Sequence, residues 1–145
     1  MHIVVLLKQV LDWEIPAQAF RVDRVKRAPA VDRAPYVMSL FDGNALEVAL
    51  KLREARASGD RITVLTLGPK RADEMLKKAL ALTADAAVRV NADDDPFDSA
   101  AKARVLAAAI QKLGGADLIL AGRQAADWEA GQVGGMIAEE LGLPC

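Results

Sequence analysis

The stretch DLILAGRQAADWEAGQVGG, residues 117–135, joins an apolar run to the start of an amphipathic segment. Residues 117–121 have the composition of a short buried strand, and the pattern after Gly131 predicts a helix that continues to about Leu141. A loop that leads from the carboxyl end of a parallel strand into a helix N terminus suits a phosphate, because glycines allow close backbone approach and the terminal amides favour an anion. This stretch therefore predicts a nucleotide site in an α/β fold.

The rest of the chain continues the alternation of strands and helices. Continuous apolar runs, typical of strands covered on both faces, occupy residues 3–7, 62–67 and 86–90. Helical periodicity covers residues 45–55, 72–82 and about 98–113. Strands that alternate with helices of this length form βαβ units, so we predict an open, Rossmann-like parallel sheet with helices on both faces. The run at residues 3–7 is expected to be a central strand.

Capping residues indicate where the helices begin and end. Asp42 or Asn44 is the candidate N-cap of the first helix, and Gly59 is its expected stop. Asp98 lies at the predicted start of the third helix, and Gly142 follows the last one.

Two stretches do not fit the alternation. Residues 13–41 contain three prolines and the alternating segment 20–25, which predicts a hairpin arm added to the sheet after the first strand. Basic and acidic residues interleave there, which favours a solvated arm over a phosphate or partner patch. Residues 91–96 contain three aspartates without the spacing of a calcium loop, so we interpret them as a polar loop before a helix and expect no metal site.

Composition excludes several classes of function. The 145 residues form one domain, residues 1–145, and the net charge of −1 gives no electrostatic footprint for nucleic acid or anionic lipid. No apolar run approaches the ~20 residues that cross a membrane, and no signal peptide precedes the first strand, so we expect a cytoplasmic protein without membrane insertion. The one cysteine, Cys145, favours a reducing compartment, and the one histidine, His2, leaves no nucleophilic triad.

Three strand ends are expected to converge on the loop after residue 121. In an open α/β sheet the ligand crevice lies beyond the carboxyl ends of the strands, here residues 6–9 and 67–69, with residues 39–42 on the same edge. The guanidinium of Arg123 would add charged hydrogen-bond donors for a phosphate, and the amides of residues 131–134 would add further donors. Neither a P-loop nor a GxGxxG motif follows the first strand, so a purely structural crossover is the alternative interpretation.

Three side chains within the loop have competing interpretations. Asp127 and Glu129 could act as an acid/base pair, but on a phosphate loop we expect them to order the loop or to contact ribose hydroxyls. Trp128 would stack on a base, face a partner subunit or form a hydrophobic plug over the helix. The residues alone do not choose among these roles.

Four segments, spaced over the whole chain, give it a resemblance to a known family. They are residues 4–10, 41–50, 79–85 and 122–127, the last followed by residues 131–134. Together they resemble the beta subunit of electron transfer flavoprotein, including its nitrogen-fixation and electron-bifurcating relatives.

The resemblance implies an adenine nucleotide alpha hydrolase-like domain that binds AMP, or a second FAD in bifurcating members. It also implies a heterodimer with an alpha subunit that carries electrons from flavin dehydrogenases to a quinone-linked acceptor, with the flavin rather than a side chain performing the redox step. The family's nucleotide contacts, carried over by position, fall on Leu6, Ser39, Leu40, Phe41, Asp42, Leu67, Gly122, Arg123, Gln124, Ala125, Ala126, Asp127, Trp128, Glu129, Ala130, Gly131, Gln132 and Val133.

The chain departs from the family pattern at residues 128–130, which leaves AMP and FAD both open, while Arg123 and residues 132–134 favour the nitrogen-fixation and bifurcating branch. The family's beta subunits continue beyond this length, so we expect a truncated chain that lacks the dehydrogenase-docking segment and self-associates through an exposed strand edge. One alternative is a free-standing nucleotide sensor of the universal stress type, whose glycine pattern is not met after Gly134. The other is an adenylating enzyme of the ATP-pyrophosphatase type, which needs an S-G-G-x-D-S loop after the first strand.

Overall fold

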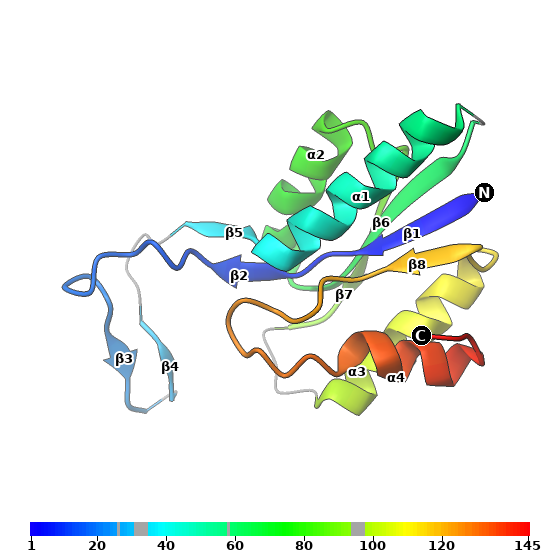
Figure 1. Cartoon of the computed structure of the whole chain (residues 1–145). Helices are drawn as coiled ribbons and strands as arrows, with labels where there is room; N and C mark the ends of the chain where they lie inside the picture. Colours follow the sequence, from blue (N-terminus) through cyan, green and yellow to red (C-terminus); the bar gives the residue numbers. More distant parts are fainter. Residues whose placement is uncertain (26, 31–34, 58, 94–97) are drawn as a thin grey trace.

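A computed structural model describes residues 1–25, 27–30, 35–57, 59–93 and 98–145 of the chain. Four parallel strands form the central sheet in the order β7-β6-β1-β8 (Figure 1). Their bounds are His2–Leu6 for β1, Arg61–Gly68 for β6, Ala86–Asn91 for β7 and Leu118–Leu120 for β8. The predicted parallel sheet is confirmed, and so is the central place of the first strand, because β1 pairs with β6 on one side and with β8 on the other.

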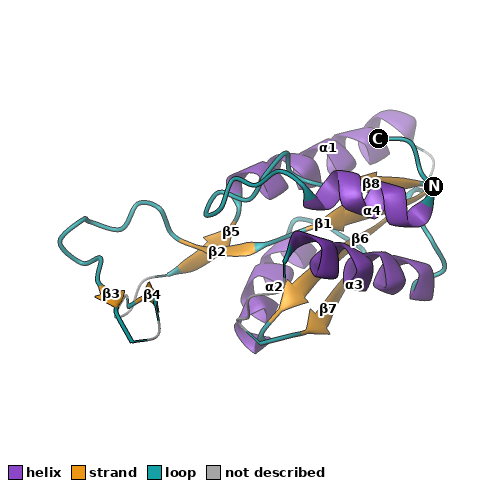
Figure 2. Cartoon of the chain, turned by 90° about the horizontal axis from the view of Figure 1, so that it is seen from below, coloured by secondary structure: helices purple, strands orange, loops and turns teal. Residues whose placement is uncertain are grey.

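In the described chain, two α-helices cover each face of the sheet (Figure 2). One face carries α1 (Leu40–Arg56) and α2 (Asp73–Ala81), with the 3-10 turn η1 (Lys70–Ala72) before α2, and the other carries α3 (Ser99–Lys112) and α4 (Val133–Leu141). Successive side chains of a strand point to opposite faces, so β1 contributes to both cores. Ile3 and Val5 pack beneath α1 and α2, whereas Val4 and Leu6 pack beneath α3 and α4.

The direction of the chain across the sheet reverses at β1. From β1 the chain moves outward to β6 and β7, and it then returns to the other side of β1 as β8. The connections that follow β1 and β8 therefore pass over opposite faces, and in doubly wound sheets such a reversal marks a crevice beyond the carboxyl ends of the strands. This crevice is the usual place for a ligand in a doubly wound sheet.

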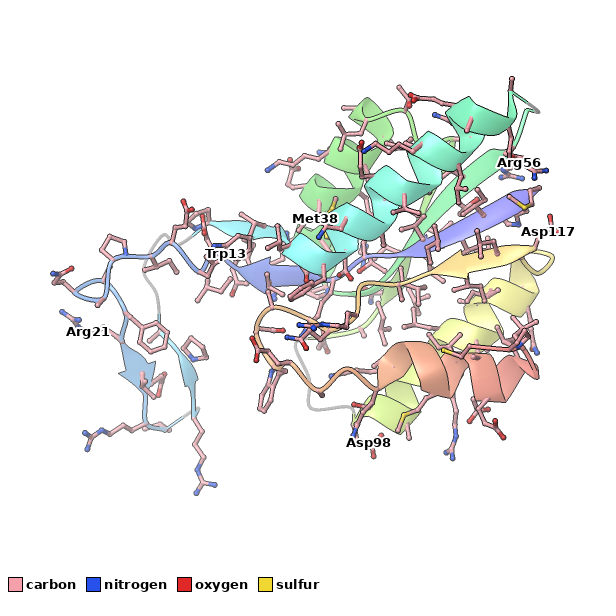
Figure 3. The ribbon with its side chains drawn as sticks, in the orientation of Figure 1. Trp13, Arg21, Met38, Arg56, Asp98 and Asp117 are labelled. Carbon is pink, nitrogen blue, oxygen red and sulfur yellow. The ribbon has the colours of Figure 1, made fainter. Side chains whose placement is uncertain are left out.

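An arm projects from the body between β1 and α1 (Figure 1). Trp13 and Arg21 lie on it, well away from the sheet (Figure 3). Two antiparallel ladders build the arm, β2 (Gln9–Leu11) with β5 (Tyr36–Met38) and β3 (Val22–Asp23) with β4 (Ala28–Pro29).

The predicted arm is confirmed, with two corrections. It begins at Gln9 rather than Trp13, because the outgoing and returning chains already pair at Gln9 and Met38. Its ladders also form sheets of their own instead of extending the parallel sheet. Residues 26 and 31–34, on which the choice between a solvated arm and a basic patch partly depends, lie outside the described residues.

The boundaries of α1 differ from the prediction at both ends. The helix begins at Leu40 with Ser39 as N-cap, so neither Asp42 nor Asn44 is the cap. At the other end Ala57, with φ 46°, provides the left-handed cap, and Gly59 lies beyond it. The reason at the N terminus is tertiary, because the Asp42 carboxylate accepts hydrogen bonds from outside the helix.

The predicted start of α3 and the predicted stop of α4 are confirmed. Asp98 is the N-cap of α3, and its carboxylate accepts a hydrogen bond from the Ala101 amide at 2.7 Å. Gly142 ends α4 in the left-handed conformation, with φ 64°.

No described helix is both long enough and apolar enough to cross a membrane. Residues 94–96 of the predicted acidic loop lie outside the described part, and the described residues contain no group of three or more His, Cys, Asp or Glu side chains that could hold a metal ion.

Candidate functional site

The buried Asp42 carboxylate joins the two strand ends that border the crevice. One oxygen, Oδ2, accepts a hydrogen bond from the backbone amide of Lys8, just after β1, at 2.7 Å. The other, Oδ1, accepts from the amide of Gly122, just after β8, at 3.2 Å. The first turn of α1 thus holds the ends of β1 and β8 together.

Burial dominates the electrostatics of Asp42, whose residue surface is 7% exposed. Desolvation raises the pKa of its carboxyl from the ordinary 3.8 to about 6. The hydrogen bonds from the Lys8 and Gly122 amides and the positive charge of Lys8 oppose this rise in pKa, while the negative charge of Asp127 adds to it. The carboxyl therefore changes its charge close to neutral pH.

Gly122 lies so close to the start of α1 that only a glycine fits. A Cβ at this position would lie 2.7 Å from the carbonyl carbon of Phe41 and 2.8 Å from the amide nitrogen of Asp42. Carbon atoms normally approach to about 3.5–4.0 Å, and both obstacles belong to the backbone. The close turn expected of Gly122 is thus present, and it brings the loop against α1.

Two further contacts hold the middle of the loop. The Lys8 ammonium donates to both carboxylate oxygens of Asp127, at 2.6 and 2.8 Å. The Ala126 amide donates to the Ser39 hydroxyl at 3.3 Å. These contacts agree with the loop-ordering role expected for Asp127 rather than with an acid/base pair.

Lys8 was not among the residues predicted to contact the nucleotide, yet its ammonium pairs with Asp127 in the middle of the loop. Its position, directly after the central strand and on the edge where the loop arrives, was the available signal. A lysine that ends a strand is normally solvated, and this makes the signal weak.

The last part of the loop folds back on itself before α4. The Glu129 amide donates to the Ala125 carbonyl at 3.0 Å, and Glu129 has φ 53°. Gly131 has φ +63°, and a Cβ there would lie 3.3 Å from the Arg123 carbonyl oxygen. Gln132 caps α4 without a side-chain hydrogen bond, and the first turn of the helix contains no acidic residue.

An apolar hollow of about 290 Å³ opens beside the loop, between α1 and the outer edge of β8. Its lining consists of Phe41, Asn44, Ala45, Val48, Leu120, Ala121, Gly122 and Arg123. The Arg123 guanidinium lies over the Phe41 ring, 5.3 Å from its centroid. Two of the residues expected to contact the nucleotide thus form one wall together.

Three other predicted contact residues are placed less directly. Trp128 is 80% exposed, so the interpretation as a hydrophobic plug is wrong, while base stacking and partner contact stay predictions. Leu6 and Leu67 lie near the carboxyl ends of β1 and β6, but their side chains pack in the core beneath α3 and α4. Only their backbones are positioned toward the crevice edge of the sheet.

The strand order and the crevice define an α/β domain of the adenine nucleotide alpha hydrolase-like kind. The chain belongs to the electron transfer flavoprotein family, because the electron transfer flavoprotein domain matches residues 30–145.

Named relatives agree with this assignment. Over 99% of this chain, it is 42% identical to the electron transfer flavoprotein subunit beta of Clostridium acetobutylicum and 40% identical to protein FixA of Azorhizobium caulinodans. It is 37% identical, over the same share, to the caffeyl-CoA reductase-Etf complex subunit CarD of Acetobacterium woodii. These matches cover 53%, 50% and 53% of the three relatives, so the chain spans about half the length of the curated relatives that it matches. The resemblance noted in the sequence is confirmed.

Proposed function

We propose that this chain binds the adenylate part of AMP or FAD in the crevice between β1 and β8, and that it acts as the nucleotide-binding part of an electron transfer flavoprotein beta subunit. The observation that carries this proposal is the joining of Lys8, Asp42 and Gly122 where the strand order reverses. This junction brings the loop of residues 122–133 to the place where doubly wound sheets bind ligands.

The phosphate is expected at the start of α4. The amides of residues 131–134 precede or begin this helix, whose dipole favours an anion there by about 0.3–1 kcal/mol. The positive charges of Lys8 and Arg123 border the same loop. The close approach of Gly122 and Gly131 to neighbouring backbone leaves the loop without side chains at two turns, which suits the approach of a phosphate.

The ribose and the base are assigned to the side chains in the middle of the loop. Ribose hydroxyls would meet the acidic residues Asp127 and Glu129, and the exposed Trp128 would stack on a base or contact a partner subunit. When a flavin is bound, it supplies the redox chemistry, and the side chains of this chain bind and orient it. The chain itself contributes no catalytic residue to this function.

The assembly follows from the family. A beta subunit pairs with an alpha subunit into a heterodimer that takes electrons from flavin dehydrogenases and delivers them to a quinone-linked acceptor, in the cytoplasm. The name of the CarD relative, a subunit of a caffeyl-CoA reductase-Etf complex, supports association with a redox enzyme such as a reductase.

Calorimetric titration of the purified chain with AMP, FAD and ATP tests the proposal, together with mass analysis of any nucleotide released on denaturation. We expect AMP or FAD to bind with one site per chain. Binding of ATP alone would favour a sensor of the universal stress type, and no heat from any of the three at millimolar concentration would contradict the proposal.

A pair of glycine variants locates the site. Gly131→Val places a β-branched side chain at φ +63° against the Arg123 carbonyl, and we expect it to abolish nucleotide retention while far-UV circular dichroism stays near wild type. Gly114→Val is the matched control, because this glycine also has a left-handed φ, +92°, but has nothing within 4 Å of the new Cβ. Equal retention by both variants would contradict the placement of the phosphate.

A further inference from the structure

The Asp42 carboxylate has a geometry that its expected role as a direct nucleotide contact does not explain. Both of its oxygens already accept backbone hydrogen bonds, from Lys8 and from Gly122. The residue is 7% exposed, and its negative charge would repel a phosphate at close range. A carboxylate whose two oxygens each accept from a different strand end is suited to holding the strand ends rather than a ligand.

We propose that Asp42 is a positioning residue, which clamps the loop after β8 to the end of β1 and so keeps residues 122–133 in the conformation that receives the nucleotide. This inference rests on the proposed function, because the loop must be the nucleotide site for the clamp to affect binding. Gly122 is the matching half of the clamp, since its lack of a side chain lets the loop reach the carboxylate.

At pH 7.5, above the pKa of about 6, the clamp is formed by an ionised carboxylate. A carboxylate accepts one strong hydrogen bond on each oxygen, whereas protonation turns one oxygen into a donor that faces an N–H. Two charged groups face Asp42 from neighbouring elements, Lys8 from the end of β1 and Asp127 from the loop. Lys8 favours the ionised form, Asp127 opposes it, and burial opposes it most strongly.

The test is therefore made at pH 7.5, above the pKa of about 6, where the Asp42 carboxyl is ionised and each of its oxygens accepts one of the two backbone hydrogen bonds.

The test compares FAD binding by wild type and by Asp42→Asn at pH 7.5. FAD is the preferred probe because its pyrophosphate has no monoester group, whereas the phosphate of AMP itself titrates near pH 6. The amide variant, which keeps only one acceptor oxygen, is expected to bind about tenfold more weakly.

Asp117→Asn is the matched control. The Asp117 carboxylate also accepts a backbone hydrogen bond from β1, from the His2 amide at 2.6 Å, but at the far end of the strand (Figure 3). This variant should retain the wild-type affinity. An Asp42→Asn variant that binds FAD as tightly as wild type would overturn the clamp.

A second readout needs no nucleotide. The amide signals of Lys8 and Gly122 in nuclear magnetic resonance spectra should shift together with a common midpoint near pH 6, and Asp42→Asn should abolish the shift. If the signals of these two amides shift together with pH but no nucleotide binds, the clamp stands and the proposed function fails. If nucleotide binds but the two amide signals do not shift together with pH, the proposed function stands and the clamp is wrong.

Discussion

The substitution Gly122→Ala gives the sharpest structural prediction. The new Cβ would lie 2.7 Å from the carbonyl carbon of Phe41 and 2.8 Å from the amide nitrogen of Asp42. Ordinary contacts of about 3.5–4.0 Å require the loop and α1 to separate by roughly 1 Å. That displacement also breaks the 3.2 Å hydrogen bond from the Gly122 amide to Asp42.

Overpacking typically lowers stability by about 1–3 kcal/mol, and loss of a hydrogen bond to a charged acceptor by about 1.5–3 kcal/mol. These effects overlap, so we expect Gly122→Ala to lower the free energy of unfolding by about 3 kcal/mol, measured by urea denaturation. Gly135→Ala is the control, since the helical Gly135 has nothing within 4 Å of a Cβ. It should be neutral or stabilise by up to about 1 kcal/mol. A Gly122→Ala protein as stable as wild type would refute the packing argument.

Three further predictions concern charge and the cysteine. The pKa of Asp42 is about 6 in the folded chain against 3.8 when solvated, so the native state binds the proton more tightly than the unfolded state. The free energy of unfolding should therefore fall by up to about 3 kcal/mol as pH rises from about 4 to 6. Urea denaturation across this range should show the fall in wild type, and an Asp42→Asn variant that shows the same fall would contradict it. Lys8→Met removes the cation paired with Asp127. It should weaken AMP binding about tenfold and reduce its salt dependence, while the unfolding free energy changes by less than about 1 kcal/mol because the pair is partly solvated. Unchanged affinity in calorimetry would argue against a phosphate beside Lys8. Cys145→Ser should alter neither stability nor nucleotide binding, because the thiol is exposed and free, and a measurable effect on either would give it an unforeseen role.

The layered sheet could be predicted from sequence because its signals are local. Residues 3–7 form a continuous apolar run, as a strand covered on both faces requires. The apolar stripes at residues 72–82 and 98–113 indicate which face of each helix packs on the sheet. Parallel order and the position of the crevice then follow from the preference for right-handed crossovers. The start of the third helix at about Asp98 and the stop of the fourth at Gly142 needed only neighbouring residues, and both predictions were correct.

The errors arose where a distant contact decided the outcome. Asp42 has the side chain of an N-cap, but the two amides that it accepts from are at Lys8 and Gly122, far away in sequence. The sequence also offered Trp128 as a plug, because its exposure depends on where the loop lies relative to α4. Lys8 was missed for the same reason, since nothing near it in sequence reveals the carboxylate that it meets.

The position of α4 has a consequence for longer members of the family. α1 and α2 share one face while the chain moves from β1 to β7, and α3 lies on the other face as the chain returns to β8. α4 lies with α3, so right-handedness would direct a fifth parallel strand, in any chain that continues past this helix, to the outer flank of β8. The hollow beside Val48 and Leu120 would then become interior. Ligand screens against this chain would in that case detect a surface that such longer chains conceal.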